Sequence, residues 1–263
     1  MKSTHLIFAA AALYSALCPA SAAERYSLWP RRPAELEQAR RLLKEHKAQE
    51  AVQILQPLMD KEGIAGREAR QIAGAANVPL YLSRRHPAAA VYTVRRGDHL
   101  AKVASSLRCP YELMMLLNGL VDPSAIHVGQ KLVYVPMRQK VEINLPRREI
   151  SVWDGPVLVA SYNIRSVAGI PGAAPEEETK VARRDGYVDG GKVPAHSPLM
   201  ASANRALALG NSIELLPVGK TAGKALLMQQ GDLNELALLV IEGTPVHITY
   251  TAADIPEAVQ PRT

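Results

Sequence analysis

The second half of this 263-residue sequence contains no cysteine. The chain has two cysteines, Cys18 and Cys109, and from Gly210 to Val246 it has neither a cysteine nor a histidine. A catalytic thiolate needs a base or a positive group beside it. Cys109, the later of the two, therefore fits a small buried hydrophobe, or a thiol that pairs with another chain, better than a nucleophile.

Other reactive combinations are weak. Lys220 and Lys224 lie close to Thr221, as in a hydroxyl–lysine pair, but the pattern around them favours a solvated loop. No cluster of His, Asp and Glu has the spacing of a metal site. No glycine-rich phosphate loop occurs. We therefore expect no metal and no cofactor.

The first residues have the pattern of a secretory signal over 1–22. Lys2 precedes an apolar run from Leu6 to Leu17, and the small residues Ala-Ser-Ala follow, as at a cleavage site. Cleavage would remove Cys18, and the bulky Leu17 before it argues against lipidation. No later apolar run is long enough to span a bilayer. We expect an exported, soluble protein of the periplasm or cell envelope.

The formal net charge of +6 favours anionic partners. For an exported protein these are wall polymers, lipid head groups or nucleic acid. No basic run interleaved with aromatic residues occurs, which argues against nucleic acid. The charge indicates mild attraction to the envelope, or merely solubility.

Residues 33–76 have the apolar periodicity of a helical hairpin. Pro33 fits a first helical turn, a third helix is expected over 67–76, and a linker or a lining strand over 78–90. The pair of helices resembles one tetratricopeptide-type unit, although one copy is not an array. We expect the hairpin to pack on its neighbour or, alternatively, to dock another protein.

Residues 91–136 predict a strand, two helices and a strand. The run "YTV" is a short β segment, and Asp98 can cap the first helix. Pro110 begins the second helix, which an Asn-Gly pair ends at Gly119 with residues that tolerate left-handed backbone. The chain then turns at Gly129 into the last strand.

The pieces "YTVRRGDHL", "NGL" and "VGQKLVYVP" resemble, at this spacing, the LysM carbohydrate-binding module. The resemblance implies a βααβ fold that binds N-acetylglucosamine-containing glycans such as peptidoglycan, in a shallow groove between two loops. The residues it places there are Gly97, Asp98, His99, Leu100, Asn118, Gly119, Leu120 and Ile126. Backbone groups would recognise acetamides, and the three apolar residues would cover the sugar face. Alternatively, those three are core only and Asp98 is a cap. Many members have a small hydroxyl residue where His99 stands.

Residues 138–250 alternate as consecutive β-strands do. Asp154-Gly155 marks a hairpin turn, and "TKVARRDGYV", "NSIELL", "KALLMQQ" and "TPVHITY" predict further strands. Asp232 and Glu235 form a capping-box pattern for a helix ending at Gly243. We therefore expect an α+β chain: a helical hairpin, a βααβ unit, a mainly β sandwich or barrel with one helix near its end, and a frayed tail over 251–263.

The third segment resembles the catalytic domain of L,D-transpeptidases of the YkuD type. The stretches "VEINLPRREISVWDGPVLVASYNI", "ALALGNSIELL" and "GDLNELALLVIEGTPVHI" carry the resemblance. Members are peptidoglycan enzymes, and the resemblance implies a cysteine thiolate that attacks a stem-peptide carbonyl, a histidine that activates it and a nearby arginine.

The matching positions hold none of these catalytic side chains. Ala225 stands at the nucleophile and Leu227 at the arginine, while Gly223 (with Lys224) and Leu216 (with Pro217) stand at His-Gly pairs. Since no cysteine follows Cys109, no other alignment restores the nucleophile.

A serine alternative remains open. Ser212 lies sixteen residues after His196, close to the family's His-to-Cys interval. This alignment misaligns the flanks, puts Glu214 at the arginine position and supplies no local base.

These observations predict an exported, non-catalytic cell-wall protein that binds peptidoglycan through LysM and tethers or scaffolds wall machinery. One alternative is an L,D-transpeptidase or wall hydrolase with non-standard catalytic residues. Another is an adaptor whose hairpin recruits a cell-wall enzyme.

Overall fold

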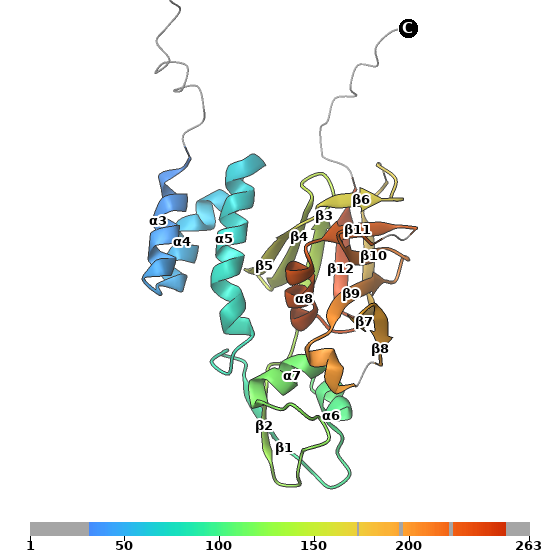
Figure 1. Cartoon of the computed structure of the whole chain (residues 1–263). Helices are drawn as coiled ribbons and strands as arrows, with labels where there is room; N and C mark the ends of the chain where they lie inside the picture. Colours follow the sequence, from blue (N-terminus) through green and yellow to red (C-terminus); the bar gives the residue numbers. More distant parts are fainter. Residues whose placement is uncertain (1–31, 173, 195–196, 221–222, 251–263) are drawn as a thin grey trace, which may run out of the picture.

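The computed structural model describes residues 32–172, 174–194, 197–220 and 223–250. The expected signal over 1–22 with Cys18, the tail over 251–263, and His196 and Thr221 lie outside the described residues. Figure 1 shows three parts: a group of helices beside a curled sheet, and a small βααβ unit below both.

Three helices form the first part: α3 (Ala34–Lys44), α4 (Ala48–Met59) and α5 (Gly63–Tyr81). Helix α5 is longer than the expected 67–76 and includes the first residues of the expected linker. Val78 and Tyr81 explain the difference, because both are buried in the core of the sheet. The hairpin therefore packs on its neighbour, along strand β5 (Figure 1).

The βααβ unit has the predicted order: β1 (Ala90–Thr93), α6 (Leu100–Ser106), α7 (Tyr111–Asn118) and β2 (Lys131–Tyr134), with β1 antiparallel to β2. Gly119 ends α7 at φ 62°, as expected. The prediction that Asp98 caps α6 is wrong. The cap position is His99, and Asp98 Oδ2 instead accepts hydrogen bonds from the Arg95 N–H at 2.7 Å and the Tyr92 hydroxyl at 2.8 Å.

The third part is one curled sheet, so the chain is α+β as predicted, and the expected sandwich or barrel is a half-barrel. Ten strands of the described residues form it in the order β5-β4-β3-β12-β7-β9-β10-β11-β6, with β8 beside β7. Pairs β3–β12 and β10–β11 are parallel. The bounds are β3 (Lys140–Asn144), β4 (Glu149–Asp154), β5 (Val157–Asn163), β6 (Ser166–Ala168), β7 (Glu177–Val188), β8 (Gly191–Val193), β9 (Asn204–Leu209), β10 (Glu214–Pro217), β11 (Ala225–Met228) and β12 (Pro245–Thr249).

Helix α8 (Gln230–Leu239) packs against the sheet, and a short 3-10 turn (Pro198–Ala201) precedes β9. The expected capping box does not form, because the helix begins before Asp232 and its cap position is Gln229. Nor does Gly243 end the helix. Val240 is already extended, and Gly243, at φ 88°, donates its N–H to the Val181 carbonyl at 2.8 Å in the turn that leads to β12.

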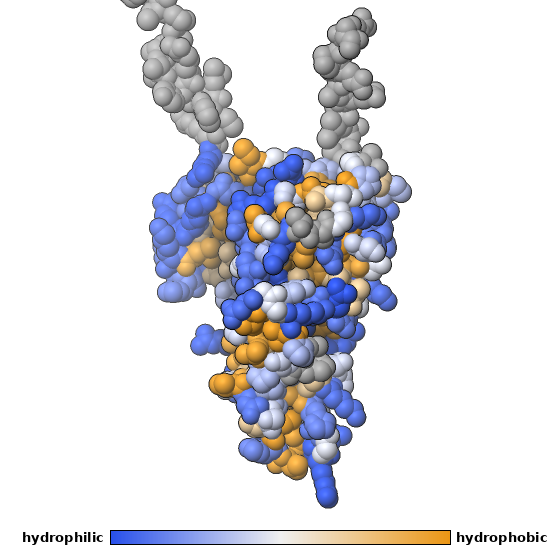
Figure 2. Space-filling view, turned by 45° about the vertical axis from the view of Figure 1, so that its right-hand side comes forward, coloured by the Kyte–Doolittle hydropathy of each residue, from blue (hydrophilic) through white to orange (hydrophobic). Residues whose placement is uncertain are grey.

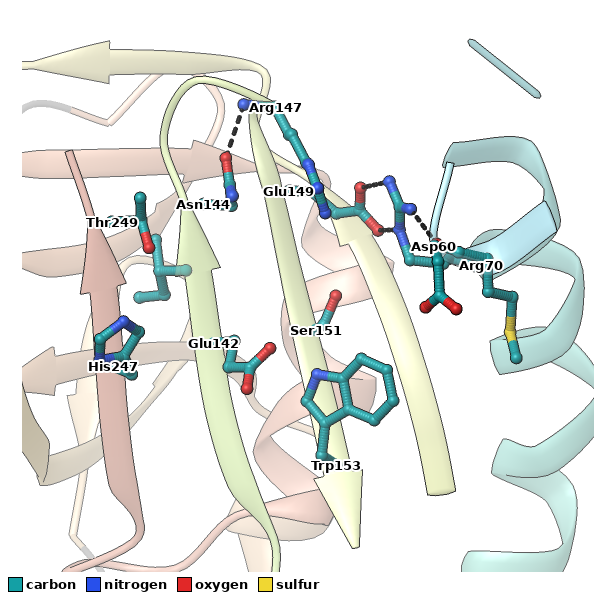
Figure 3. A pocket seen from close by; sticks show the side chains of 12 residues that line it. Asp60, Arg70, Glu142, Asn144, Arg147, Glu149, Ser151, Trp153, His247 and Thr249 are labelled. Atoms are coloured by element: carbon teal, nitrogen blue, oxygen red, sulfur yellow. Dashed lines mark hydrogen bonds and ion pairs between the residues drawn. The ribbon is translucent and has the colours of Figure 1, made fainter. Parts of the chain in front are cut away.

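A buried Arg–Glu pair fastens the hairpin to the sheet. Arg70 of α5 binds both carboxylate oxygens of Glu149 on β4 at 2.7 Å (Figure 3). The Ser161 hydroxyl donates to the same carboxylate at 2.7 Å, and Arg70 also donates to the carbonyls of Met59 and Lys61. A bidentate charged pair fixes direction as well as distance, so it sets how α5 lies on the sheet.

A second buried cluster joins the βααβ unit to the sheet. Glu112, in the first turn of α7, accepts from Arg184 of β7 at 2.7 Å and from Arg205 of β9 at 2.9 Å. Burial alone would raise the pKa of Glu112, but the two guanidinium groups outweigh it and hold the pKa below its ordinary value. Arg184 also donates to the Ala237 carbonyl of α8 at 2.7 Å. The cluster thus connects one helix of the small unit to three elements of the larger one.

We predict that Gly74→Ala destabilises the protein, whereas Gly231→Ala does not. An added Cβ at Gly74 would lie 2.8 Å from the backbone nitrogen of Ser161, so α5 would have to move off β5. At Gly231, also helical, no atom lies within 4 Å. Urea denaturation should show a loss of about 1–3 kcal/mol in the unfolding free energy for the first. The second should gain up to about 1 kcal/mol from helix propensity. Equal effects would contradict the close packing.

We also predict that Glu112→Gln lowers stability by about 3–5 kcal/mol at neutral pH, because it leaves two buried guanidinium groups without a counter-charge. Glu50→Gln, an exposed change in the first turn of α4, is the control.

The pH dependence of Glu112 has a definite sign. Because the folded pKa is depressed, the stabilisation is present above the ordinary value of 4.5 and is lost as the pH falls through the folded pKa. Urea midpoints measured between pH 7 and 3 should fall less steeply in Glu112→Gln than in the unchanged protein. Parallel curves would contradict the assignment.

Candidate functional site

Backbone hydrogen bonds join the end of β1 to the turn that precedes β2. The Val94 N–H donates to the Gln130 carbonyl at 2.9 Å, and the Gly129 N–H donates to the Val94 carbonyl at 2.9 Å. These bonds hold the end of β1 against the loop that follows α7. They tie the segment that precedes the loop at Gly97 to the end of the loop that begins at Gly119.

The first loop offers an ordered polar turn. Gly97 and His99 are exposed. Hydrogen bonds from the Arg95 backbone and the Tyr92 hydroxyl lower the pKa of Asp98, so it is ionised. The Arg95 guanidinium lies 5.9 Å from the centre of the Tyr92 ring. Asp98 acts here as an organiser of the turn.

The predicted apolar residues divide between core and surface. Leu100 is 2% exposed and belongs to the core of the βααβ unit, as its alternative interpretation held. Leu120 and Ile126 are half-buried against that core. The Asn118 side chain already has hydrogen-bond partners. Its Oδ1 accepts from the Val133 N–H at 2.8 Å, and its Nδ2 donates to the Val133 carbonyl at 2.7 Å. Gly119 is exposed.

Two apolar loop residues were not singled out from the sequence. Val121 is 88% exposed and Val128 is 70% exposed, both in the second loop. Figure 2 shows apolar surface among polar side chains at the lower end of the molecule, where this unit lies. Apolar loop residues that face solvent have no periodicity, so only the three-dimensional position distinguishes them from core.

The positions that the transpeptidase resemblance makes catalytic lie close together on β10 and β11. The parallel register pairs Leu216 with Leu227. Ala225 is fully buried, and Leu216 and Leu227 are half-buried. Gly223 is exposed, although its carbonyl oxygen lies so close to Gly169 that a Cβ added to Gly169 would be 1.7 Å from it. The described residues at these positions form a packed strand pair rather than an open cleft.

A pocket of about 280 Å³ opens beside this strand pair. Lys224 and Glu177 lie on its wall together with Tyr250, whose hydroxyl donates to Glu177 at 2.5 Å. Burial and this bond raise the pKa of Tyr250 to about 12. The three side chains can bind a polar group, but none of them is a nucleophile paired with a base.

The remaining candidates for a nucleophile have unsuitable surroundings. Ser212 is exposed in the turn between β9 and β10 at φ 68°. Lys220 and Lys224 are exposed. Cys109 is buried, as predicted, and burial raises the pKa of its thiol to about 12. At neutral pH it is therefore protonated and unreactive.

Figure 3 shows another hollow, of about 190 Å³, between the hairpin and the outer face of the sheet. Side chains from β12, β3 and β4 line it in neighbouring positions, among them His247, Glu142 and Ser151. His247 forms its hydrogen bond with Glu178 at 2.8 Å. The hollow is polar, and its histidine interacts with a carboxylate rather than with the serine.

Among the residues that the structure describes, no group of three or more His, Cys, Asp and Glu could hold a metal ion. No helix in the same part of the chain is long and apolar enough to cross a membrane.

Comparisons with known proteins place one segment in a family. The LysM domain family matches residues 92–134. No curated protein matches the chain. Among solved structures, a mutant L,D-transpeptidase from Enterococcus faecium is 14% identical with a TM-score of 0.31, covering 42% of this chain and 49% of that one. An L,D-transpeptidase from Mycobacterium smegmatis is 13% identical with a TM-score of 0.30, covering 47% and 64%.

The chain thus spans less than two thirds of the length of each of these structures. At this identity and TM-score the likeness assigns neither an activity nor catalytic residues. The family match is of another kind, because it coincides with the βααβ unit in both bounds and order of elements. Residues 92–134 are therefore a LysM domain, which this chain carries between a helical hairpin and a curled sheet.

Proposed function

We propose that this protein is an exported cell-wall protein that binds peptidoglycan through its LysM domain and has no transpeptidase activity of its own. The observation that carries the proposal is the LysM match over residues 92–134. LysM domains bind N-acetylglucosamine-containing glycans, and the two loops of this domain have exposed polar and apolar groups.

The glycan contacts in this proposal come from both loops. Exposed backbone at Gly97 and Gly119 would recognise acetamide groups. Ile126, Leu120 and the more exposed Val121 would cover the apolar face of a sugar ring. Leu100 is left out of this surface because it is buried.

The non-catalytic part of the proposal is supported by the chain's own residues. Ala225 and Leu227 offer no nucleophile and no cation, and Cys109 is buried as a neutral thiol. The sheet then serves as a scaffold to which the LysM domain and the hairpin are fastened by buried charge. Through it the protein would tether or scaffold wall machinery, with a cell-wall enzyme as the partner.

Sedimentation with purified sacculi tests the binding. We expect the mature protein to sediment with them, and Val121→Ser to weaken the apparent affinity roughly fivefold, since it removes about 1 kcal/mol of apolar contact. Ile64→Ser is the matched control, because Ile64 is 82% exposed but lies on α5 of the hairpin. Protein left in the supernatant, or equal losses in both variants, would count against glycan binding at these loops.

Muropeptide analysis tests the absence of catalysis. After incubation with tetrapeptide-bearing sacculi, we expect the same muropeptide profile with and without the protein. An active L,D-transpeptidase run in parallel shows that the substrate is competent. New 3–3 cross-links or shortened stems would overturn the non-catalytic assignment and support the enzyme alternative.

A further inference from the structure

A cavity of about 370 Å³ lies at the junction between the LysM domain and the sheet. Helix α6 and the start of α7 form one wall, and Arg184, Met200 and Ile241 belong to the other. This volume is within the range of small-molecule sites. Neither the glycan loops nor the positions compared with transpeptidases line it.

The charges beside this cavity do not balance. Glu112 is a single carboxylate shared by two guanidinium groups, and its two oxygens are taken, one by Arg184 and one by Arg205. The exposed fraction of the side chain is 3% for Glu112, 11% for Arg184 and 4% for Arg205. With two guanidinium groups and one carboxylate, the cluster carries an excess positive charge. Because an uncompensated buried charge is costly, the cluster favours the binding of an anion.

Neighbouring carboxylates do not supply the missing charge. Asp185 follows Arg184 on β7, but it pairs with Arg183 at 2.6 Å and Lys192 at 2.8 Å, since successive side chains of a strand face opposite ways. Glu242 lines the cavity but is exposed. Within the described part of the chain, no ion pair joins Glu242 to Arg184 or Arg205.

Arg184 also has an unused donor. Its Nη2 donates to Glu112 and to the Ala237 carbonyl, whereas its Nε–H is buried and has no hydrogen-bond partner among the described residues. A buried donor without an acceptor is destabilising. Arg108, exposed on the LysM side, adds a second cation to the cavity wall.

We propose that this junction cavity binds a small oxyanion, a carboxylate or a phosphate, at Arg184 and Arg108. The oxyanion balances the excess charge of the Arg184–Glu112–Arg205 cluster, and the apolar wall at Ala104, Met200 and Ile241 receives the carbon skeleton of an organic anion. Because the LysM domain and the part of the chain that contains the sheet both line the cavity, a bound oxyanion stabilises the association of these two parts. The site is independent of glycan binding at the loops.

Thermal unfolding of the full chain at neutral pH and constant ionic strength tests the proposal. The probes are inorganic phosphate, acetate and N-acetylalanine, with the uncharged amide of N-acetylalanine and sodium chloride as controls. We expect a saturable rise of several degrees in Tm with an oxyanion and none with the controls. The size of the Tm rise with phosphate, compared with that with the two carboxylates, identifies the preferred oxyanion. No saturable rise, or an equal rise with the neutral amide, would overturn the proposal.

Four variants place the site. Arg184→Met should abolish the rise, and Arg183→Met, its exposed neighbour on the other face of β7, should keep it. Glu112→Gln adds one more uncompensated positive charge and should strengthen oxyanion binding about tenfold. If Arg184→Met does not fold, Ser105→Trp decides, since it fills the exposed rim of the cavity without touching the charge cluster. An unchanged phosphate response in Ser105→Trp would place the binding elsewhere and refute the site.

Discussion

The position of Glu112 between two guanidinium groups is the constraint on which the arrangement of this molecule depends. The LysM domain and the sheet have separate apolar cores, and apolar contact alone does not fix orientation. The hydrogen bonds from Arg184 and Arg205 to the Glu112 carboxylate do fix the orientation, because charged hydrogen bonds are directional. One residue in the first turn of α7 therefore sets how the LysM domain is oriented relative to the sheet.

The hairpin is fastened by the same means. Arg70 reaches Glu149 across 79 positions of sequence, and Glu112 of α7 meets the sheet through pairs separated by 72 and 93 positions. Local patterns carry no information on such pairs. The sequence therefore predicted the order of the helices and strands and the α+β class, but not the way in which the three parts are joined.

Competing partners and tertiary packing explain the errors in the predicted helix ends. Asp98 and Asp232 both have the residue type and position of a helix cap. Asp98 instead accepts from the Tyr92 hydroxyl and the Arg95 backbone. Asp232 lies inside α8, where burial raises its pKa and Arg165 lowers it. Likewise Val78 and Tyr81 continue α5 beyond its expected end because the sheet offers them a core. The βααβ unit was predictable from motif spacing, whereas the exposure of Val121 was not.

The sheet illustrates how a position can lose a function through packing as well as through side-chain identity. Ala225, where the transpeptidase resemblance puts the nucleophile, is fully buried, and the backbone of Gly169 lies directly over the Gly223 carbonyl. A cysteine at 225 alone would be a buried thiol, and burial raises a thiol pKa, as it does at Cys109. Reactivity would require a cation or base beside it and an open approach for the substrate. Lys224, the residue before Ala225, is a cation, but its side chain is exposed and lines the neighbouring pocket, whereas Ala225 itself is fully buried.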